Sequence, residues 1–450
     1  MIGVSIAPGS EPHSAETRIL FDLTRTIARV HHAAPRGIDR VALEYALFLE
    51  GLPQDRVSYC FHHAGAWRVL ARPVARWLLA GLARRWLGWD VAPLRGGFTA
   101  QRVLRRPRAR SVLRAAFSRP LRRPDHPTVY LNVSHKAWRP LGELRRLGGD
   151  SLKIVALLHD VMPLSCPQFF PSDLREEFRA GLDVLMQEAD LLITNTRDTR
   201  CAVEAWAQEQ RVAMPPTVHV PFGIRTLPHA ELQPALPEVP HFVCFGGADP
   251  RKNFALMKAV WSRLAARVAA GDVTGAPLPR LYVLGLQEGA CQVPGVVPVP
   301  RATDLRVAEL LRTARALLFP SLAEGFGFPV WEAFAAGAPA ICSDLPVFRE
   351  IGGSVAELLP PDSVEHWVEA VLEYSHPDSL SRQRQVLCLQ AYRVPTWSGH
   401  FSALGELLRD VLHGVPAGLI GQEASPASAS HPRARVHERA SEPPALSASG

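Results

Sequence analysis

The sequence predicts an α/β fold with two domains, each built on a mostly parallel, doubly wound sheet, that face each other across a cleft. Three observations support this prediction. The chain has 450 residues, which is more than one ordinary domain needs. Along most of it, β-prone apolar runs alternate with amphipathic helical patterns, as in parallel sheets covered by helices. A proline-rich stretch at residues 215–240 interrupts this alternation and is typical of a connector.

The N-terminal domain is expected at residues 18–225, after a flexible leader at residues 1–17. Its first strand is predicted at residues 18–24, which read RILFDLT. A helix is predicted at residues 38–49 because its apolar residues recur on one helical face. Further elements are strands at 128–133, 153–158 and 191–194 and a helix at 171–189.

The C-terminal domain is expected at residues 241–395, after a linker at residues 226–240. Strands are predicted at 241–245, 281–284, 316–319 and 340–343, and helices at 254–269, 305–314, 330–336 and 364–374. An amphipathic C-terminal helix is predicted within residues 396–415. Residues 417–450 are expected to be disordered because Ser, Ala, Pro and Glu follow one another there without periodicity.

Residues 324–332, with the sequence EGFGFPVWE, have the strongest functional pattern. Gly325 and Gly327 let the backbone approach a ligand without a Cβ in the way. The helix that follows directs its free N–H groups and positive dipole end toward the ligand, which favours phosphate. Glu324 and Glu332 can face the same pocket, and carboxylates accept hydrogen bonds from vicinal sugar hydroxyls. For Glu332 alone, an ordinary helix start is an equally good interpretation.

This segment resembles the signature of family 4 of the retaining glycosyltransferases, whose two Rossmann-like domains form the GT-B fold. Residues 245–253 (FGGADPRKN), 220–224 (VPFGI) and 343–350 (SDLPVFRE) resemble other stretches of that family. Residues 18–49 and 155–170 resemble the N-domain of members that assemble polysaccharide and lipopolysaccharide, which include mannosyltransferases. In all, the resemblance covers residues 18–415.

The resemblance implies a catalytic role for Glu324 beside the donor hexose and for Arg251 and Lys252 at the diphosphate. Glu332 would hold the ribose hydroxyls. The chain contains no Asp-x-Asp, so these two cations would replace a divalent metal and no cofactor beyond the nucleotide sugar is expected. Further donor-binding positions, mainly through the backbone, are Gly246, Gly247, Gly325, Phe326, Gly327 and Phe328.

Two N-domain segments are candidates for contact with the donor sugar or the acceptor. His159, which the resemblance adds to the catalytic candidates, ends an apolar run and is followed by Asp160, which could orient its imidazole. A histidine at a strand end can equally be a satisfied structural residue. Gly37 opens the predicted helix at 38–49 where the family has a second glycine loop, and Arg40 could meet an anionic acceptor.

Residues 66–126 are expected to form an insertion rich in arginine and tryptophan. A cationic helix with tryptophans suits an anionic membrane surface, where a lipid-linked acceptor would reside. The alternative is an arginine-coated helix packed on the N-terminal domain. Nucleic-acid binding is disfavoured because no known nucleic-acid module surrounds the stretch.

The sequence therefore predicts a metal-independent retaining hexosyltransferase that acts on a polysaccharide or lipid-linked oligosaccharide. GDP-mannose is the donor that the resemblance favours, and the predicted location is the cytoplasm or the inner face of the membrane. Two alternatives remain open: a sugar-nucleotide epimerase on the same scaffold, and a non-catalytic partner that binds a sugar nucleotide.

Overall fold

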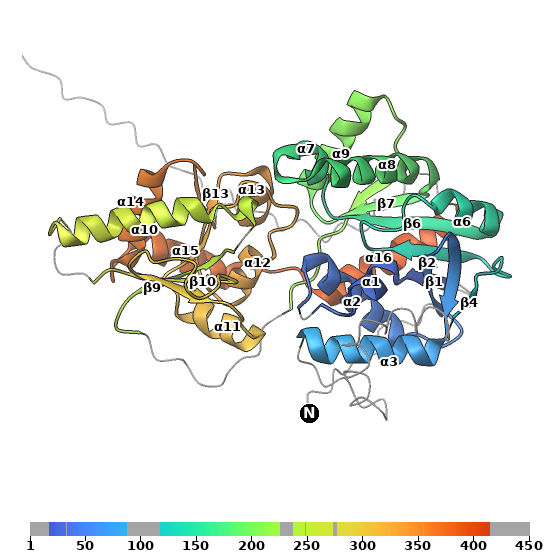
Figure 1. Ribbon diagram of the computed structural model, residues 1–450, viewed down its shortest axis with the longest axis horizontal. Coiled ribbons are helices and arrows are strands. Elements are labelled where there is room, and N and C mark those ends of the chain that lie inside the picture. The colour runs from blue at the N-terminus through green and yellow to red at the C-terminus, as the bar shows by residue number, and fades with distance from the viewer. Residues whose placement is uncertain are drawn as a thin grey trace, which may run out of the picture.

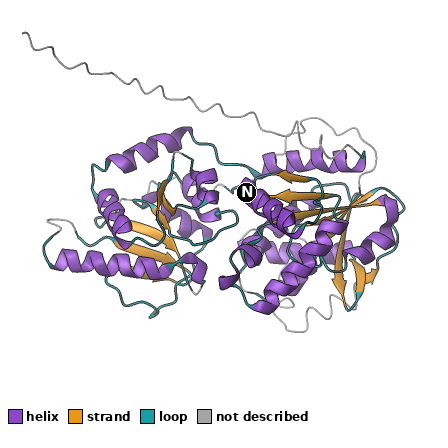
Figure 2. Cartoon of the chain, turned by 90° about the horizontal axis from the view of Figure 1, so that it is seen from above, coloured by secondary structure: helices purple, strands orange, loops and turns teal. Residues whose placement is uncertain are grey.

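The computed structural model describes residues 18–32, 34–87, 118–225, 237–247, 249–272, 277–353 and 355–414. These residues form two α/β domains, each built around its own sheet (Figures 1 and 2). The predicted leader at residues 1–17, residues 226–236 of the predicted linker and the predicted tail at residues 417–450 lie outside the described residues.

The N-terminal sheet has the strand order β4-β3-β2-β1-β5-β6-β7-β8. Its strands are parallel except β3, which runs antiparallel to β2 and β4. Successive residues alternate between the two faces, so that Phe21 enters one core and Leu20 the other. The strands are β1 (Arg18–Asp22), β2 (Val57–His63), β3 (Ala66–Leu70), β4 (Ser118–Pro120), β5 (Thr128–Asn132), β6 (Leu152–Leu158), β7 (Leu191–Thr194) and β8 (Thr217–His219).

Helices cover both faces of this sheet, as the alternating sequence pattern predicts. In α2, the predicted apolar face is buried at Val41, Tyr45 and Leu49. The helices are α1 (Thr24–Arg29), α2 (Gly37–Glu50), α3 (Arg72–Leu82), α6 (Leu141–Gly148), α7 (Met162–Ser165), α8 (Ser172–Glu188) and α9 (Arg197–Gln210).

The C-terminal sheet is parallel throughout, with the order β11-β10-β9-β12-β13-β14. Its strands are β9 (His241–Phe245), β10 (Arg280–Leu284), β11 (Val296–Val299), β12 (Leu317–Phe319), β13 (Ala340–Ser343) and β14 (Glu357–Leu359). Its helices are α10 (Phe254–Ala269), α11 (Asp304–Thr313), α12 (Phe328–Ala335), α13 (Pro346–Gly352), α14 (Val364–Ser375) and α15 (Leu380–Ala391).

Each sheet has a point where the strand order reverses. In the N-terminal sheet it lies between β1 and β5, and in the C-terminal sheet between β9 and β12. In doubly wound sheets, ligands bind beyond the carboxyl ends of the strands at such a point. A ligand site is therefore expected at the loops after β9 and β12.

The last described helix, α16 (Trp397–Leu412), packs on the N-terminal domain although the chain has just left the C-terminal one (Figure 1). Its apolar face, including Phe401 and Leu404, joins the core of the N-terminal domain. Tyr45 and His400 are joined by a 2.6 Å hydrogen bond between Oη and Nε2. The C-terminal helix thus belongs structurally to the first domain.

The proline-rich connector predicted at residues 215–240 begins with ordered, buried structure. After β8, Val220, Phe222 and Ile224 all lie in the core of the N-terminal domain. The Phe222 ring lies 5.0 Å from that of Phe326 and 5.9 Å from that of Phe328, both from the C-terminal domain. Phe222 thus joins the two domains.

Replacement of Phe222 by alanine is expected to destabilise the chain by about 3–5 kcal/mol, the usual loss for a fully buried phenylalanine. The midpoint of chemical denaturation measures this effect. Phe48→Ala is a matched control, because Phe48 stacks on Phe401 but its side chain is partly exposed. Equal midpoints for the two variants would contradict a structural role for Phe222 between the domains.

The predicted insertion at residues 66–126 is part of the N-terminal domain at both described ends. Residues 66–70 and 118–120 are strands β3 and β4 of the main sheet. Leu78 and Leu82 point into the core, so the apolar face of α3 lies on protein, and Trp86 in the turn that follows is buried there too. Arg72 donates hydrogen bonds to the carbonyl groups of Gln54 and Val57 at 2.6 and 3.2 Å. For this part, the packed-helix interpretation holds; residues 88–117 lie outside the described residues.

None of the described helices combines the length and the apolar character that crossing a bilayer requires.

Candidate active site

Lys252 and Glu324 meet at the reversal point of the C-terminal sheet. Lys252 follows β9 through a short 3-10 turn, and Glu324 follows β12. Because β9 and β12 are parallel neighbours, both loops leave the same edge of the sheet. The Lys252 ammonium group donates a hydrogen bond to Glu324 Oε1. The N–H of Leu322 also donates to the carbonyl of Arg251 at 2.7 Å, which fastens the two loops together.

Arg251 lies beside this pair and reaches the N-terminal domain. Its guanidinium donates to both carboxylate oxygens of Asp249, at 3.1 Å from Nε and 2.7 Å from Nη2. It also lies over the Phe170 ring, 5.4 Å from the centroid, and near Met162. Arg251 and Lys252 are thus each paired with a carboxylate, and an anionic ligand would have to compete with those partners.

Gly325 lies where the two domains touch. A Cβ at this position would be 2.8 Å from the carbonyl oxygen of His159 and 3.0 Å from the Cβ of Asp160. The Gly325 carbonyl accepts hydrogen bonds from the hydroxyls of Thr196 at 3.2 Å and Thr199 at 3.5 Å. Only glycine permits this approach, so the predicted donor loop rests directly on the predicted histidine segment.

The other donor-loop positions have local structural reasons for their residue types. Gly327 precedes α12 with a φ of +70°, a conformation that favours glycine. Gly247 has a φ of +129°, and a Cβ on Gly246 would meet Val283 at 2.6 Å. Phe326 and Phe328 pack their rings against Phe222 and against each other, so these side chains have a structural reason as well.

His159 is buried at the end of β6. Its Nε2 is 2.9 Å from the carbonyl oxygen of Val133, so the imidazole donates its proton there. Burial lowers the pKa of His159 to about 4, which keeps the ring neutral near pH 7. Its backbone N–H donates to Nε2 of His135 at 2.9 Å.

The prediction that Asp160 orients the His159 imidazole is wrong. The Asp160 carboxylate accepts a hydrogen bond from the N–H of Met162 at 3.1 Å, and the Val133 carbonyl holds the imidazole instead. Adjacent residues of an extended chain point to opposite sides, which separates the two side chains. Burial raises the pKa of Asp160 to about 6.

Arg40 and Gly37 lie next to the predicted donor helix α12. Arg40 is 3.0 Å from the carboxylate of Asp304 and 4.0 Å from that of Glu332, both on the C-terminal domain. A Cβ at Gly37 would be 3.8 Å from the ring of Phe328. Burial raises the pKa of Glu332 to about 7, and Asp304 adds to this rise while Arg40 opposes it.

Sequence reasoning missed Glu350 as a contact between the domains. Its carboxylate accepts hydrogen bonds from the N–H groups of Arg197 at 2.9 Å and Asp198 at 3.0 Å, at the start of α9. A carboxylate is favoured at this position because a helix N-terminus carries unsatisfied N–H groups and partial positive charge. The Thr196-x-x-Thr199 pattern marks the helix start in the sequence, but nothing in it identifies the distant partner.

Comparison with known proteins assigns a family to the C-terminal domain. Residues 239–376 match the model of the family Glycosyl transferases group 1. These residues form a glycosyl transferases group 1 domain. It contains both halves of the Lys252–Glu324 pair, together with Arg251 and Glu332. His159, Gly37 and Arg40 lie in the N-terminal domain, outside the match.

Curated relatives extend the likeness beyond the glycosyl transferases group 1 domain. The chain is 27% identical over 257 residues to the serotype-specific mannosyltransferase WbdA of Escherichia coli, covering 50% of this chain and 31% of that protein. It is 32% identical over 149 residues to the O-antigen chain mannosyltransferase RfbU of Salmonella typhimurium, covering 32% of this chain and 40% of the relative. The chain thus spans about a third of the length of WbdA.

Solved structures show the same fold around the group 1 domain. Anabaena HepE, solved with UDP and glucose, has a TM-score of 0.55 at 14% identity, covering 88% of this chain and 100% of that one. Sucrose-phosphate synthase from Thermosynechococcus elongatus has a TM-score of 0.53 at 14% identity, covering 89% and 100%. At such identities the likeness concerns the fold alone, which is the predicted GT-B arrangement of two Rossmann-like domains.

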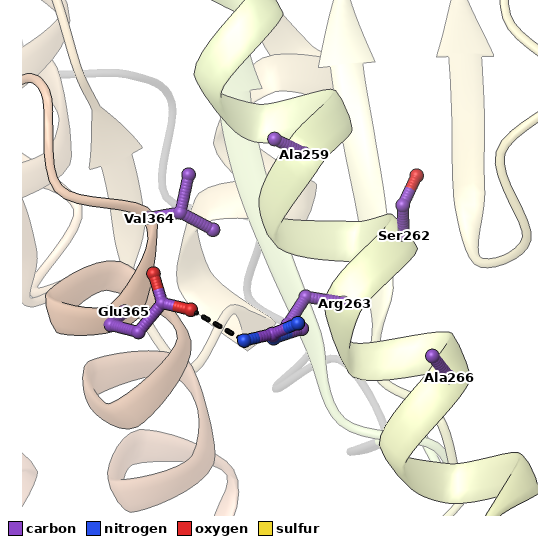
Figure 3. A pocket seen from close by; sticks show the side chains of 6 residues that line it. All are labelled: Ala259, Ser262, Arg263, Ala266, Val364 and Glu365. Atoms are coloured by element: carbon purple, nitrogen blue, oxygen red, sulfur yellow. Dashed lines mark hydrogen bonds and ion pairs between the residues drawn. The ribbon is translucent and has the colours of Figure 1, made fainter.

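The group 1 domain also has an open groove of 420 Å³ between the outer helices α10 and α14 (Figure 3). Ala259, Ser262 and Ala266 line one side, and Arg263 donates a 2.9 Å hydrogen bond across it to Glu365. This groove lies on helix surfaces and not at the strand ends, so it is not the predicted donor site.

Proposed function

We propose that the chain is a retaining hexosyltransferase that moves a hexose from a nucleotide-diphosphate sugar to a polysaccharide or lipid-linked oligosaccharide. The observation that supports this best is the Lys252–Glu324 pair at the reversal point of a glycosyl transferases group 1 domain. The Lys252 cation can bind the diphosphate of such a donor, and the Glu324 carboxylate beside it can bind the hydroxyls of its sugar.

In this proposal, the donor replaces the internal ion pairs. Its diphosphate binds the Lys252 ammonium and some of the N–H donors of the Arg251 guanidinium. Its hexose hydroxyls donate hydrogen bonds to the Glu324 carboxylate. As the bond from the sugar to the diphosphate breaks, negative charge grows on the leaving phosphate, and fixed cations stabilise that charge in the transition state. Positive charge grows on the sugar, as in glycoside cleavage generally.

We also propose that Lys252 and Arg251 take the place of a divalent ion, so that transfer needs no metal. Transfer that is unchanged in excess EDTA is the expected result. Activity that EDTA abolishes and magnesium or manganese restores would contradict this part of the proposal.

GDP-mannose is the donor we propose to test first, because the named relatives are mannosyltransferases. A thermal-shift screen of GDP-, UDP- and dTDP-sugars identifies the ligand, since a ligand at 100 times its Kd stabilises by about 2.7 kcal/mol. Product analysis with that donor then separates the alternatives. A glycosylated acceptor supports the proposal, an isomerised sugar nucleotide indicates an epimerase, and binding without turnover indicates a non-catalytic partner.

We further propose that the enzyme works at the inner face of the membrane, where a lipid-linked acceptor would be presented. The arginine-rich sequence of residues 68–123 motivates this proposal. Co-sedimentation with vesicles containing anionic phosphatidylglycerol at low salt is the test. Absence of binding there would leave only acceptors that reach the enzyme in solution.

Donor affinity is expected to rise from about pH 6 to about pH 8. With a pKa of about 7, Glu332 is ionised in about a tenth of the molecules at the lower pH and about nine-tenths at the higher one. The ionised form accepts the hydrogen bonds of the ribose hydroxyls, so the donor KM should fall by up to about tenfold across this range. Initial rates at varied donor concentration and pH measure the effect.

Two variants test whether Glu332 causes that pH dependence. Glu332→Gln should flatten the profile, because its amide does not titrate. Asp304→Asn should move the profile to lower pH, because Asp304 helps to raise the pKa of Glu332. A profile that neither variant changes would assign the titration to another group.

A further inference from the structure

Two arginines of α1 share one carboxylate of α2. Arg25 Nε is 2.8 Å from Asp39 Oδ1, and Arg29 Nε is 2.6 Å from Asp39 Oδ2. Asp39 also accepts the N–H of Arg36 at 2.8 Å. The Asp39 side chain is 1% exposed and those of Arg25 and Arg29 are 16% exposed, so the group is largely removed from water.

The charges of this group do not balance. Two guanidinium ions face one carboxylate, and burial of an unpaired charge is unfavourable. Both arginines use Nε toward Asp39, and among the described residues neither makes a hydrogen bond from its terminal Nη nitrogens. Each guanidinium thus keeps its outer N–H donors, the ones that bind carboxylate and phosphate in pairs.

The start of α2 adds positive potential at the same place. The helix begins at Gly37, and the first N–H groups of a helix have no partner within it. Asp39 satisfies the N–H of Arg36 only, and the Arg36 side chain is exposed nearby. A helix N-terminus beside two constrained guanidiniums is a strong setting for an anion.

The cluster of Arg25, Arg29 and Asp39 belongs to the N-terminal domain and lies near its contact with the C-terminal domain. Gly37 approaches Phe328 at the start of the donor helix α12. The cations proposed for the donor diphosphate, Lys252 and Arg251, belong instead to the C-terminal domain and have Glu324 and Asp249 as partners. The arginines around Asp39 therefore form a second group of cations, which belongs to the other domain.

We infer that Arg25 and Arg29, held in place by Asp39, bind a phosphate or diphosphate group carried by the acceptor. This inference rests on the proposed hexosyl transfer, because it assigns the N-terminal domain to the acceptor. Asp39 acts as a positioning residue: it fixes the two guanidiniums side by side and neutralises one of their charges. An acceptor with a lipid diphosphate and one with a phosphorylated sugar share the chemistry that this site recognises.

Isothermal titration of the full chain tests the inference. The chain is first saturated with GDP or UDP, whichever binds, and then titrated with inorganic pyrophosphate, farnesyl diphosphate and mannose 6-phosphate. At least one of these probes should bind, and the tightest one indicates whether a lipid diphosphate or a sugar phosphate is preferred. Arg25→Gln and Arg29→Gln should each weaken that binding about tenfold, the loss of one charge-assisted contact, and leave the nucleotide Kd unchanged.

Arg76→Gln is the matched control, because Arg76 of α3 pairs with Glu50 at the opposite end of α2 from Asp39, and the variant should bind all probes normally. If a glutamine variant does not fold, Arg25→Lys and Arg29→Lys keep the charge and should weaken binding less. The inference is wrong if no probe binds the nucleotide-saturated chain, if pyrophosphate only competes with the nucleotide, or if the arginine variants bind like the wild type. If instead no nucleotide binds, the proposed function fails, and titration of the free chain with pyrophosphate still tests the site.

Discussion

Replacement of Lys252 by alanine is expected to lower kcat about a hundredfold, the scale of losing one preorganised contact to developing negative charge. Lys252 is the cation closest to Glu324, and it is held over the Phe319 ring at 4.5 Å from the centroid. Its position is therefore set before the donor arrives. Because the charge on the leaving phosphate grows only in the transition state, the loss should fall mainly on kcat and less on the donor KM.

Lys258→Ala is the control for this experiment. Lys258 is the other lysine of the domain, on the exposed side of α10, and its removal should leave kcat unchanged. Lys252→Arg should retain part of the activity because it keeps the charge but changes the geometry. A near-normal kcat for Lys252→Ala would remove Lys252 from the proposed mechanism.

Glu324→Ala is expected to reduce kcat by a similar factor, about a hundredfold. The effects of the two substitutions should not add in the double variant, because the side chains are in contact. Thermal unfolding must accompany each assay, since removal of one partner leaves the other partly buried charge unpaired. A double variant whose loss equals the product of the single losses would show that the residues act independently.

The contact between Lys252 and Glu324 could be predicted because the position of each residue, just after a strand, can be seen in the sequence. Each residue lies in a loop that follows an apolar strand and contains glycines, and parallel neighbours end at the same sheet edge. Strong helical periodicity likewise predicted α10 at its observed bounds and α16 within a range of a few residues around it. Helices and strand-end loops that depend on local sequence patterns are thus predicted well from the sequence.

Features that depend on distant partners could not be predicted in this way. The amphipathic face of α16 shows that it packs on protein but does not say which domain receives it. Strand β4 is a three-residue edge strand with the sequence SRP, and β3 follows β2 after a short turn, so the pattern at residues 66–126 predicts an insertion and not two strands of the main sheet. The contact from Glu350 to α9 joins residues more than 150 positions apart, and a single sequence has no signal for such a pair.

Gly325→Ala is the most informative test of how the two domains cooperate. A Cβ at this position would stand 2.8 Å from the His159 carbonyl oxygen, closer than real Cβ contacts allow. The φ of Gly325 does not favour glycine, so the effect would come from this contact and not from backbone strain. Either the loop moves away from Lys252 or the domains separate, and misplacement by about 1 Å can lower the rate about a hundredfold.

Gly405→Ala provides the matched control, because a Cβ at that helical position meets nothing within 4 Å. Alanine there should keep activity and raise stability by up to about 1 kcal/mol. For Gly325→Ala, we expect kcat to fall about a hundredfold while nucleotide binding to the C-terminal domain is retained, because the clash arises at the N-terminal domain. Loss of nucleotide binding together with activity would instead mean that the loop shapes the nucleotide site by itself. Normal turnover would show that the contact between Gly325 and His159 is not needed for catalysis.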